Sequence, residues 1–331
     1  MADRRRIIAT DMEMAPALAD EVTAASKKGF EVARLEAVTD DRRRDVEVLL
    51  IRSSGLIGKK LFNDFPNVKL LQSMSAGVDF INISSIPRDV VLCSNAGAYR
   101  EPIAEHVFAM ILYFAKNLQR NHKRLQRGIF DNSPDATFLA GKTIGIIGAG
   151  GIGQSVARVA KAFNMRTVGI NTKGNHVPSF DEVWPMDGLD ELLKGSDFVV
   201  VSIPLNVHTR NLIDKRKLNE MKEDAVLVNV ARGPIISQGD LYSHLKSHGR
   251  FRAGIDVWWV YPKKGEKFSL DYPFFELPNF LGSPHIADGV PEANEEGQRR
   301  AFENVTRYVG GQPLVRVIDK ADYNGFTGAH H

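Results

Sequence analysis

Short runs of apolar and β-branched residues alternate along the chain with amphipathic stretches. A first series comprises RIIAT, FEVARL, DVEVLLIRS, KLLQSM and VVLCSN, and the intervening stretch PALADEVTAASKK has helical spacing. A second series comprises KTIGIIG (142 to 148), RTVGIN, DFVVVSIP, AVLVNVAR, RAGIDV and FLGSPH. Strands that alternate with helices form parallel sheets covered on both faces. The pattern therefore predicts an α/β protein with two doubly wound parallel sheets of the Rossmann-like or flavodoxin-like kind.

Three further segments are predicted to be helices. The apolar segment IAEHVFAMILYFA (103 to 115) contains Glu105 and His106 and is too short to span a bilayer, so we expect a buried helix that begins near Pro102. The basic stretch KNLQRNHKRLQR behind it is expected to be a solvated or subunit-packing helix. The amphipathic segment PEANEEGQRRAFENVTRYVGG near the end is expected to return to the first domain.

Size and charge exclude several classes of protein. At roughly 150 residues per domain, a chain of 331 residues predicts two domains. The formal charge is only +3, which does not indicate nucleic acid or a membrane surface as the main partner. The single cysteine, Cys93, excludes an internal disulfide, and the N-terminus MADRRRIIAT has no apolar stretch of signal-peptide length. These features predict a cytoplasmic protein, and we expect no metal site.

A glycine-rich loop joins the first strand of the second series to a helix. In IGIIGAGGIGQSVARVAKAF, Gly148, Gly150 and Gly153 form the pattern G-x-G-x-x-G directly between strand and helix. Such glycines permit a tight turn, a close approach of pyrophosphate and close packing of helix on strand. With Gly151 and Ile152 at the helix N-terminus, where backbone amides favour negative charge, they predict a dinucleotide site. A glycine-rich turn that binds nothing is the alternative interpretation.

The end of the next strand bears on the choice of cofactor. An acid about 20 residues beyond the glycine loop commonly binds the ribose hydroxyls of NAD, but Asn171 stands here. An uncharged side chain does not repel a 2'-phosphate, and Thr172 and Lys173 can donate hydrogen bonds and positive charge to it. We therefore expect NADP in preference to NAD. If Lys173 is an ordinary solvated lysine in a turn, this preference does not follow.

Two polar side chains stand at the ends of later strands, where open α/β sheets bind ligands. Arg232 ends the run AVLVNVAR, and His285 follows the last run in SPHIAD. An arginine can bind a carboxylate or a carbonyl oxygen, and a histidine can exchange a proton near neutral pH. Beside a hydride-carrying cofactor, the pair predicts a site for carbonyl reduction. Singly, each could be an exposed strand-end residue or a cap.

These motifs together resemble the D-isomer-specific 2-hydroxyacid dehydrogenase family, particularly its glyoxylate and hydroxypyruvate reductases. GAGGIG, NVARGPI, GIDVWWVYP and SPHIA occur in the family's order and spacing, and the match extends from about Asp45 to Gly310. The resemblance implies a discontinuous substrate domain (1 to 98 and 288 to 331) and a nucleotide-binding domain (99 to 287), with a cleft between them. It also implies a homodimer formed through the nucleotide-binding domain.

The resemblance also implies roles for individual residues. Arg232 would bind the substrate carboxylate and polarise the keto oxygen, and His285 would protonate that oxygen. Backbone amides of Ala76, Gly77 and Val78 in SMSAGVD would hold the carboxylate, since free amides in a turn bind anions. By position, Asp256 would lie near the nicotinamide or its ribose. The cofactor cleft would be lined by Pro204, Thr209, Val230 and Ala231. Arg52, near Met74 and Tyr99, would border the substrate pocket.

One position departs from the family pattern. Most members carry a glutamate five residues after the strand-end aspartate, paired with the histidine, whereas this chain has Tyr261. Three interpretations remain open: Tyr261 orients His285, Glu266 replaces the missing acid, or catalysis is weak. We favour the first, because the motif spacing puts Tyr261 at the orienting position. Trp258 and Trp259 are expected to close the cleft mouth or pack under the loop, and no role is assigned to Asp288, which stands where glycine is common.

The sequence thus predicts an NADP-preferring, NAD(P)-dependent reductase that converts small 2-keto acids such as glyoxylate or hydroxypyruvate to D-2-hydroxy acids. The catalytic residues would be Arg232, His285 and Tyr261. Two alternatives remain: a nucleotide-sensing binding protein of the same fold, and a phosphoglycerate dehydrogenase-like enzyme. No nucleic acid or membrane partner is expected.

Overall fold

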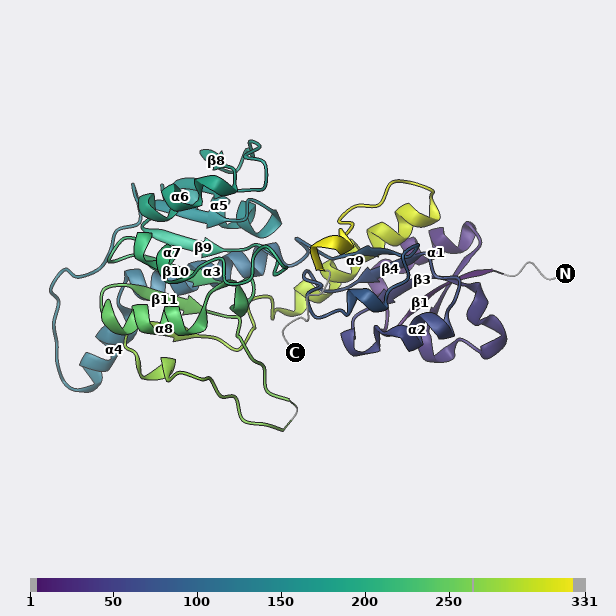
Figure 1. Ribbon diagram of the computed structural model, residues 1–331, viewed down its shortest axis with the longest axis horizontal. Coiled ribbons are helices and arrows are strands. Elements are labelled where there is room, and N and C mark those ends of the chain that lie inside the picture. Colours follow the sequence, from purple (N-terminus) through teal and green to yellow (C-terminus); the bar gives the residue numbers. More distant parts are fainter. Residues whose placement is uncertain (1–4, 264, 324–331) are drawn as a thin grey trace. The chain divides into compact units, whose positions relative to one another are not determined.

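The computed structural model describes residues 5–263 and 265–323, which form two compact units. One unit comprises the described residues up to Tyr99 together with those from Val290 onward, and it is called unit 1 below. The other comprises Arg100–Gly289 and is called unit 2. Each unit is built around its own parallel sheet (Figure 1). The predicted α/β fold with two parallel sheets is confirmed.

Unit 1 contains a five-stranded sheet in the order β2-β1-β3-β4-β5, and its neighbouring strands pair in parallel. The strands are β1 (Arg6–Thr10), β2 (Phe30–Arg34), β3 (Val46–Ile51), β4 (Leu70–Ser73) and β5 (Val91–Cys93). This is the flavodoxin-like order, in which the chain reverses its direction of progress across the sheet between β1 and β3. Ligands of such sheets bind outside the carboxyl ends of the strands.

Helices cover both faces of this sheet, which explains the apolar character of its strands. On β3, Leu49 and Ile51 pack on the face covered by α2 (Lys59–Asp64), while Val48 and Leu50 pack on the other face. That second face is covered by α1 (Ala19–Lys27) and α9 (Pro291–Val309). The last helix of the chain therefore lies beside the first strands, as the yellow ribbon of α9 next to purple elements shows (Figure 1).

Unit 2 contains a seven-stranded sheet in the order β12-β11-β10-β9-β6-β7-β8. The strands are β6 (Thr143–Ile147), β7 (Arg166–Ile170), β8 (Glu182–Trp184), β9 (Phe198–Val201), β10 (Val226–Asn229), β11 (Arg252–Ile255) and β12 (Phe280–Gly282). The helices are α3 (Arg100–Ala115), α4 (Leu118–Gln126), α5 (Gly151–Ala162), α6 (Leu189–Gly195), α7 (Lys215–Glu220) and α8 (Gln238–Ser247). This is the Rossmann order, with its switch point between β6 and β9.

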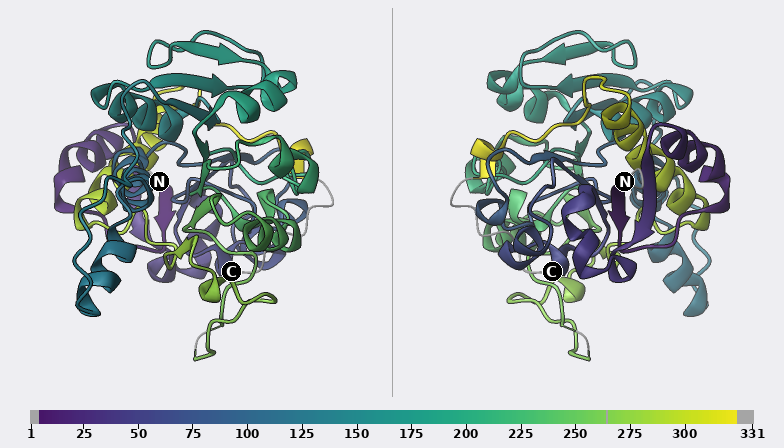
Figure 2. Two further views of the ribbon diagram at one scale, coloured as in Figure 1. Left: turned by 90° about the vertical axis from the view of Figure 1, so that its left-hand side faces the viewer. Right: turned by 90° about the vertical axis from the view of Figure 1, so that its right-hand side faces the viewer.

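The helix α4 and the segment after it extend away from the sheet of unit 2 (Figure 2). Helix α4 buries none of its residues, whereas α3 buries eight of its residues, among them Val107, Phe108 and Ile111. The expected buried helix at 103 to 115 is thus confirmed. Within the described ranges, no helix is both long enough and apolar enough to cross a membrane.

Candidate active site

The glycine loop of unit 2 has the geometry that a dinucleotide requires. Gly148 follows β6 with a φ of 111°, a conformation that other residues rarely adopt, and a side chain there would lie 2.8 Å from the Ser202 carbonyl oxygen. A Cβ at Gly153 would collide with the Gly148 carbonyl, so this glycine permits α5 to pack on the strand. A Cβ at Gly150 would meet nothing within 4 Å, so this side of the loop is open. The opening fits a pyrophosphate.

The first turn of α5 supplies the donors for such a ligand. The helix spans 12 residues and begins at Gly151, with Gly150 as its N-cap. Its first amides, those of Gly151, Ile152 and Gly153, have no carbonyl partner within the helix, and the helix dipole adds positive potential there. The loop and the helix together fit the phosphates of a dinucleotide.

Asn171 shapes the loop that follows β7. Its side-chain oxygen accepts hydrogen bonds from the backbone amides of Lys173 and Asn175, both at 3.1 Å, and its amide group donates to the Asn175 carbonyl at 2.8 Å. The Asn171 side chain is therefore used to hold the turn. Thr172 and Lys173 are exposed on this turn and are its candidate donors to a phosphate.

Thr209 closes the loop that follows β9. Its hydroxyl donates to the Pro204 carbonyl at 2.7 Å and accepts from the Asn206 amide at 2.9 Å. Because β9 and β6 are adjacent and parallel, this loop and the glycine loop leave the same edge of the sheet. The structure thus places Pro204 and Thr209 at the predicted edge.

A buried asparagine fixes the turn that carries Arg232. Asn229, the last residue of β10, is fully buried, and its side chain accepts from the Ala231 amide at 3.0 Å and donates to the Arg232 carbonyl at 2.9 Å. The Arg232 guanidinium donates to the Ala231 carbonyl at 2.7 Å. Val230 and Ala231 form the body of this turn. Sequence reasoning missed Asn229, although an asparagine at the end of an apolar strand was a signal.

His285 occupies a strained backbone position. Its φ is 54°, in the left-handed region that few residues other than glycine adopt, and its amide donates to the Ser283 carbonyl at 3.0 Å. Such strain persists only where surrounding contacts impose it, and it is concentrated at functional sites.

Asp256 holds His285 in this conformation through hydrogen bonds with neighbouring residues. Its carboxylate is 1% exposed and accepts hydrogen bonds from the Ser283 hydroxyl at 2.5 Å, the Ile286 amide at 3.0 Å and the Ala287 amide at 3.1 Å. These contacts lie on both sides of His285 in the chain. Both carboxylate oxygens accept hydrogen bonds from the loop that carries His285, and the place near the nicotinamide or its ribose that the resemblance implies stays a prediction.

His106 adds a second support from α3. Its Nε2 lies 2.9 Å from the Ser283 hydroxyl oxygen and 3.6 Å from the Asp256 carboxylate. Because the Ser283 hydroxyl donates its proton to Asp256, its oxygen accepts from His106, and Nε2 therefore carries a proton. Sequence reasoning placed His106 in a buried helix and gave it no role.

Tyr261 lies beside His285. The two ring centroids are 5.4 Å apart with an interplanar angle of 40°, and the Tyr261 hydroxyl oxygen accepts a hydrogen bond from the Trp258 amide at 3.1 Å. Glu266 is exposed, and its carboxylate accepts from the Lys263 amide at 3.2 Å. This placement favours Tyr261 over Glu266 as the residue that occupies the orienting position. Trp258 and Trp259 pack under the neighbouring loops, Trp258 being 4% exposed.

In unit 1, the predicted substrate residues stand at the carboxyl edge of the sheet. Ala76, Gly77 and Val78 follow β4, and Arg52 follows β3. The Asp11 carboxylate accepts hydrogen bonds from the amides of Arg52 at 2.8 Å and Ser53 at 2.7 Å. The Arg52 guanidinium donates to the Asn294 side chain, and the Tyr99 hydroxyl donates to the Met74 carbonyl at 3.0 Å. Asp11 and Asn294 were not predicted, because their partners are distant in sequence.

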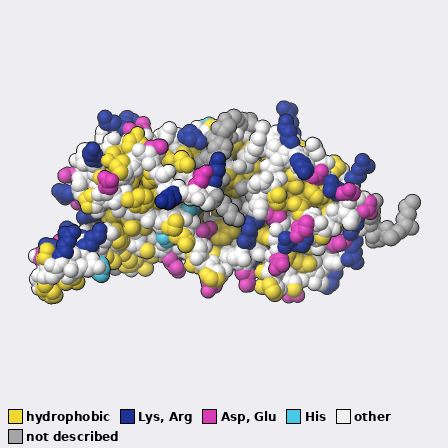
Figure 3. All heavy atoms as spheres, turned by 90° about the horizontal axis from the view of Figure 1, so that it is seen from below, with side chains coloured by type: hydrophobic (Ala, Val, Ile, Leu, Met, Phe, Trp, Pro, Cys, Tyr) yellow, Lys and Arg dark blue, Asp and Glu magenta, His cyan; other side chains and the backbone are white. Residues whose placement is uncertain are grey.

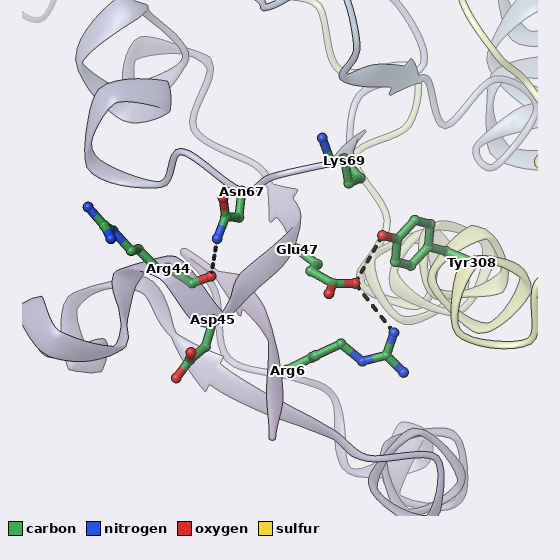
Figure 4. A pocket seen from close by; sticks show the side chains of 7 residues that line it. All are labelled: Arg6, Arg44, Asp45, Glu47, Asn67, Lys69 and Tyr308. Carbon is green, nitrogen blue, oxygen red and sulfur yellow. Dashed lines mark hydrogen bonds and ion pairs between the residues drawn. The ribbon is translucent and has the colours of Figure 1, made fainter. Parts of the chain in front are cut away.

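A pocket of about 420 Å³ lies in unit 1 at the opposite, amino edge of the sheet (Figure 4). Its lining residues are Arg6, Arg44, Asp45, Glu47, Asn67, Lys69 and Tyr308. Glu47 pairs with Arg6 at 3.6 Å and accepts from the Tyr308 hydroxyl at 3.0 Å, and Lys69 pairs with Asp89. Burial, with the nearby Glu47 charge, raises the pKa of Tyr308 to about 12. The pocket lies at the edge opposite the carboxyl ends of the strands, where ligands of such sheets bind, so we do not take it as the candidate active site.

No metal-binding group of three or more His, Cys, Asp or Glu side chains occurs among the described residues. The glycine loop and the turns that carry Arg232 and His285 all follow strands of the sheet of unit 2. A Rossmann sheet with a glycine loop of this geometry is typical of proteins that bind a dinucleotide.

Comparison with known proteins identifies the family. Residues 108–287 match the model of the D-isomer specific 2-hydroxyacid dehydrogenase, NAD binding domain. The D-3-phosphoglycerate dehydrogenase of Methanocaldococcus jannaschii is 30% identical over 283 residues, covering 84% of this chain and 53% of that protein. The chain thus spans about half the length of that relative. The glyoxylate reductase of Pyrococcus furiosus is 29% identical over 289 residues, covering 85% of this chain and 84% of that protein.

A solved structure agrees with these sequence matches. It is described as an acyclic imino acid reductase in complex with NADPH and D-Arg, and it superimposes with a TM-score of 0.74 at 27% identity, covering 95% of this chain and 100% of that one. The chain belongs to the D-isomer specific 2-hydroxyacid dehydrogenase family and is an oxidoreductase with a nicotinamide cofactor. The predicted family and enzyme class are confirmed.

Proposed function

We propose that the protein is an NADPH-preferring reductase of small 2-keto acids, such as glyoxylate or hydroxypyruvate, that yields D-2-hydroxy acids. The proposal rests mainly on two constrained turns that stand at the same edge of the sheet of unit 2, the edge formed by the carboxyl ends of its strands. Arg232 follows β10 and is fixed by Asn229, and His285 follows β12 and is fixed by Asp256. The relatives named glyoxylate reductase support this substrate class.

Each residue has a chemical task in this proposal. Arg232 binds the substrate carboxylate and polarises the keto oxygen, because a guanidinium presents a fixed fork of donors. His285 donates a proton to that oxygen as it becomes a hydroxyl. A nicotinamide bound to unit 2 supplies the hydride. In unit 1, the amides of Ala76, Gly77 and Val78 hold the carboxylate, and Arg52 borders the substrate.

The same proposal assigns the cofactor to unit 2 (99 to 287 in the sequence interpretation) and the substrate to unit 1. Gly148, Gly150, Gly151, Ile152 and Gly153 would hold the pyrophosphate. Pro204, Thr209, Val230 and Ala231 would line the nicotinamide side. Thr172 and Lys173 would bind the 2'-phosphate of NADP, since Asn171 is occupied in holding their turn.

Tyr261 would orient His285. Its hydroxyl oxygen accepts a hydrogen bond from the Trp258 backbone amide, which holds the phenol in the loop that follows β11. The adjacent rings at 5.4 Å support this role. The phenol would thus occupy the place of the family's glutamate without its charge.

The test follows oxidation of NADPH and NADH with glyoxylate, hydroxypyruvate, pyruvate and an aromatic 2-keto acid. Arg232→Ala should reduce kcat/KM at least about 100-fold, because a bidentate contact to the carboxylate is lost. Arg216→Ala is the matched control, since Arg216 is an exposed arginine of α7 paired with Asp190. No turnover with any acid, together with tight NADPH binding, would contradict the reductase and favour a nucleotide-sensing protein.

A second candidate substrate is the imino acid formed from a 2-keto acid and an amine. Tyr261 beside His285 favours it, because an iminium carries its own proton and depends less on a charged imidazole. The match to the acyclic imino acid reductase also supports it. NADPH oxidation that requires both pyruvate and methylamine would favour this class, whereas oxidation with pyruvate alone would favour the keto acid.

We also propose that unit 2 forms the homodimer. Helix α4 and the segment to Phe138 expose large apolar side chains: Leu118 (55%), Leu125 (57%), Phe130 (83%) and Phe138 (74%). The lobe at the left of Figure 3 shows apolar and basic side chains side by side on its surface. Large exposed apolar surface marks an interface. Light scattering should give a dimer for the wild type and a monomer for Phe130→Asp, and a monomeric wild type would contradict this.

A further inference from the structure

The peptide that joins Trp258 to Trp259 lies between the two turns that carry Arg232 and His285. It follows β11, which pairs with β10 on one side and β12 on the other. Gly233 follows Arg232 directly, and a Cβ on it would collide with the Trp258 carbonyl group and lie 2.6 Å from the Trp259 nitrogen. The arginine turn therefore packs directly on the backbone of the tryptophan pair.

The two indoles donate hydrogen bonds to different loops. Trp258 Nε1 donates to the Ser283 carbonyl at 2.9 Å, two residues before His285. Trp259 Nε1 donates to the Ile236 carbonyl at 2.7 Å, four residues after Arg232. Adjacent residues thus hold the histidine loop and the arginine loop separately.

Both rings are fixed by their surroundings. Trp258 packs against Phe268 with a centroid distance of 4.8 Å, and a Cβ at Gly282 would lie 2.6 Å from its ring edge. Trp259 stacks on Phe274 at 5.5 Å with an interplanar angle of 14°. Among apolar side chains, only tryptophan combines this area with an N–H donor, and a phenylalanine keeps ring packing without the donor.

We propose that Trp258 and Trp259 are positioning residues with separate tasks, Trp258 for His285 and Trp259 for Arg232. The inference rests on the proposed function. Loss of the hydrogen bond from Trp258 to the Ser283 carbonyl frees the backbone next to His285, the proposed proton donor. This loss should slow the chemical step. Loss of the hydrogen bond from Trp259 to the Ile236 carbonyl frees the backbone that follows Arg232, the proposed carboxylate-binding residue. This loss should weaken substrate binding.

The test compares Trp258→Phe and Trp259→Phe with Trp184→Phe. Trp184 is the chain's third tryptophan, and its indole donates to the Glu182 carboxylate at 3.1 Å on β8, at the far edge of the same sheet. We expect Trp258→Phe to lower kcat about tenfold with the KM for the keto acid within about twofold. We expect Trp259→Phe to raise that KM about tenfold with kcat within about twofold. NADPH affinity, measured by fluorescence titration, should stay unchanged in all three.

A merely structural role would give a different result. Trp258→Phe and Trp259→Phe would then lower kcat and raise KM together, in proportion to the fall in Tm, and this outcome overturns the proposal. Unchanged kinetics in both variants also overturns it. If a phenylalanine variant does not fold, β-(3-benzothienyl)alanine at the same position removes the N–H while retaining the ring shape.

A spectroscopic measurement separates this proposal from the proposed function. If the wild type turns over no 2-keto or imino acid, the reductase proposal fails, but the position of His285 can still be measured. In ¹⁵N-histidine-labelled protein, with the His285 signals identified by His285→Ala, Trp258→Phe should shift those signals and Trp259→Phe and Trp184→Phe should not. Unshifted signals in Trp258→Phe would overturn the positioning role.

Discussion

Asp256 and Ser283 join the ends of two neighbouring strands, β11 and β12, through a hydrogen bond of 2.5 Å from the Ser283 hydroxyl to the Asp256 carboxylate. The same carboxylate accepts from the amides of Ile286 and Ala287, so the residue between these contacts, His285, is held in its left-handed conformation. A buried acid thus acts on the proposed proton donor through the backbone. The conformation of His285 can therefore be changed by a substitution at Asp256, with His285 itself left intact.

Asp256→Asn should release this loop. An amide group cannot accept from all three donors, because one of its two ends carries protons. We expect a loss of about 2 kcal/mol in the free energy of unfolding and a fall in kcat of about 100-fold, measured by urea denaturation and steady-state kinetics. Asp187→Asn, at an exposed position after β8, is the control. An Asp256→Asn enzyme with wild-type kcat would show that the bonds do not position His285.

Tyr261→Glu should restore the family's pattern beside His285. A carboxylate favours the charged imidazole, so the proton donor should persist to higher pH. We expect the alkaline fall in kcat/KM for keto acid reduction to move up by about one pH unit. Tyr261→Gln is the matched control, because glutamine has nearly the same shape as glutamate but no charge. It should leave the alkaline fall at the same pH. Equal pH profiles for the two variants would place Tyr261 away from the imidazole in solution.

Asn171→Asp should reverse the expected cofactor preference. An acid at the end of β7 repels a 2'-phosphate and can accept from the ribose hydroxyls of NADH. The ratio of kcat/KM for NADPH to that for NADH should fall by about tenfold or more. Asn175→Asp is the control, because Asn175 is exposed on the same turn and contacts Asn171 through its backbone. A wild-type preference for NADH would contradict the NADP assignment at the outset.

His244 makes the stability of unit 2 depend on pH. Burial, and secondarily the nearby His248, lowers the pKa of His244 from 6.5 to about 4. The unfolded chain therefore takes up a proton at this residue between about pH 6.5 and pH 4 while the folded protein does not, so stability is lost as pH falls through this window. The loss should approach about 3 kcal/mol in the free energy of unfolding.

Denaturation of His244→Leu at pH 7 and pH 4.5 checks this prediction. The variant should lack the His244 part of the pH dependence, while His122→Gln, at an exposed position of α4, should retain it. An unchanged difference in stability between the two pH values in His244→Leu would contradict the assignment.

The sequence alone determined the fold class, because the period of apolar residues and the strand-to-helix alternation are local properties. It also placed Gly148, Gly150, Arg232 and His285 at strand ends, since parallel strands present their carboxyl ends at one edge. The order of strands within each sheet was not available from pattern, because pairing joins segments that are distant in the chain.

Only the tertiary structure decided which polar residues support the site. Three hydrogen bonds, those between Asp256 and Ile286, between His106 and Ser283, and between Asp11 and the Arg52 amide, join residues 30, 177 and 41 positions apart. A motif records which residues follow one another, but a hydrogen bond depends on distance in space. The same reason explains the tryptophan pair: the sequence showed two adjacent aromatic residues, and the fold sends their N–H groups to different loops.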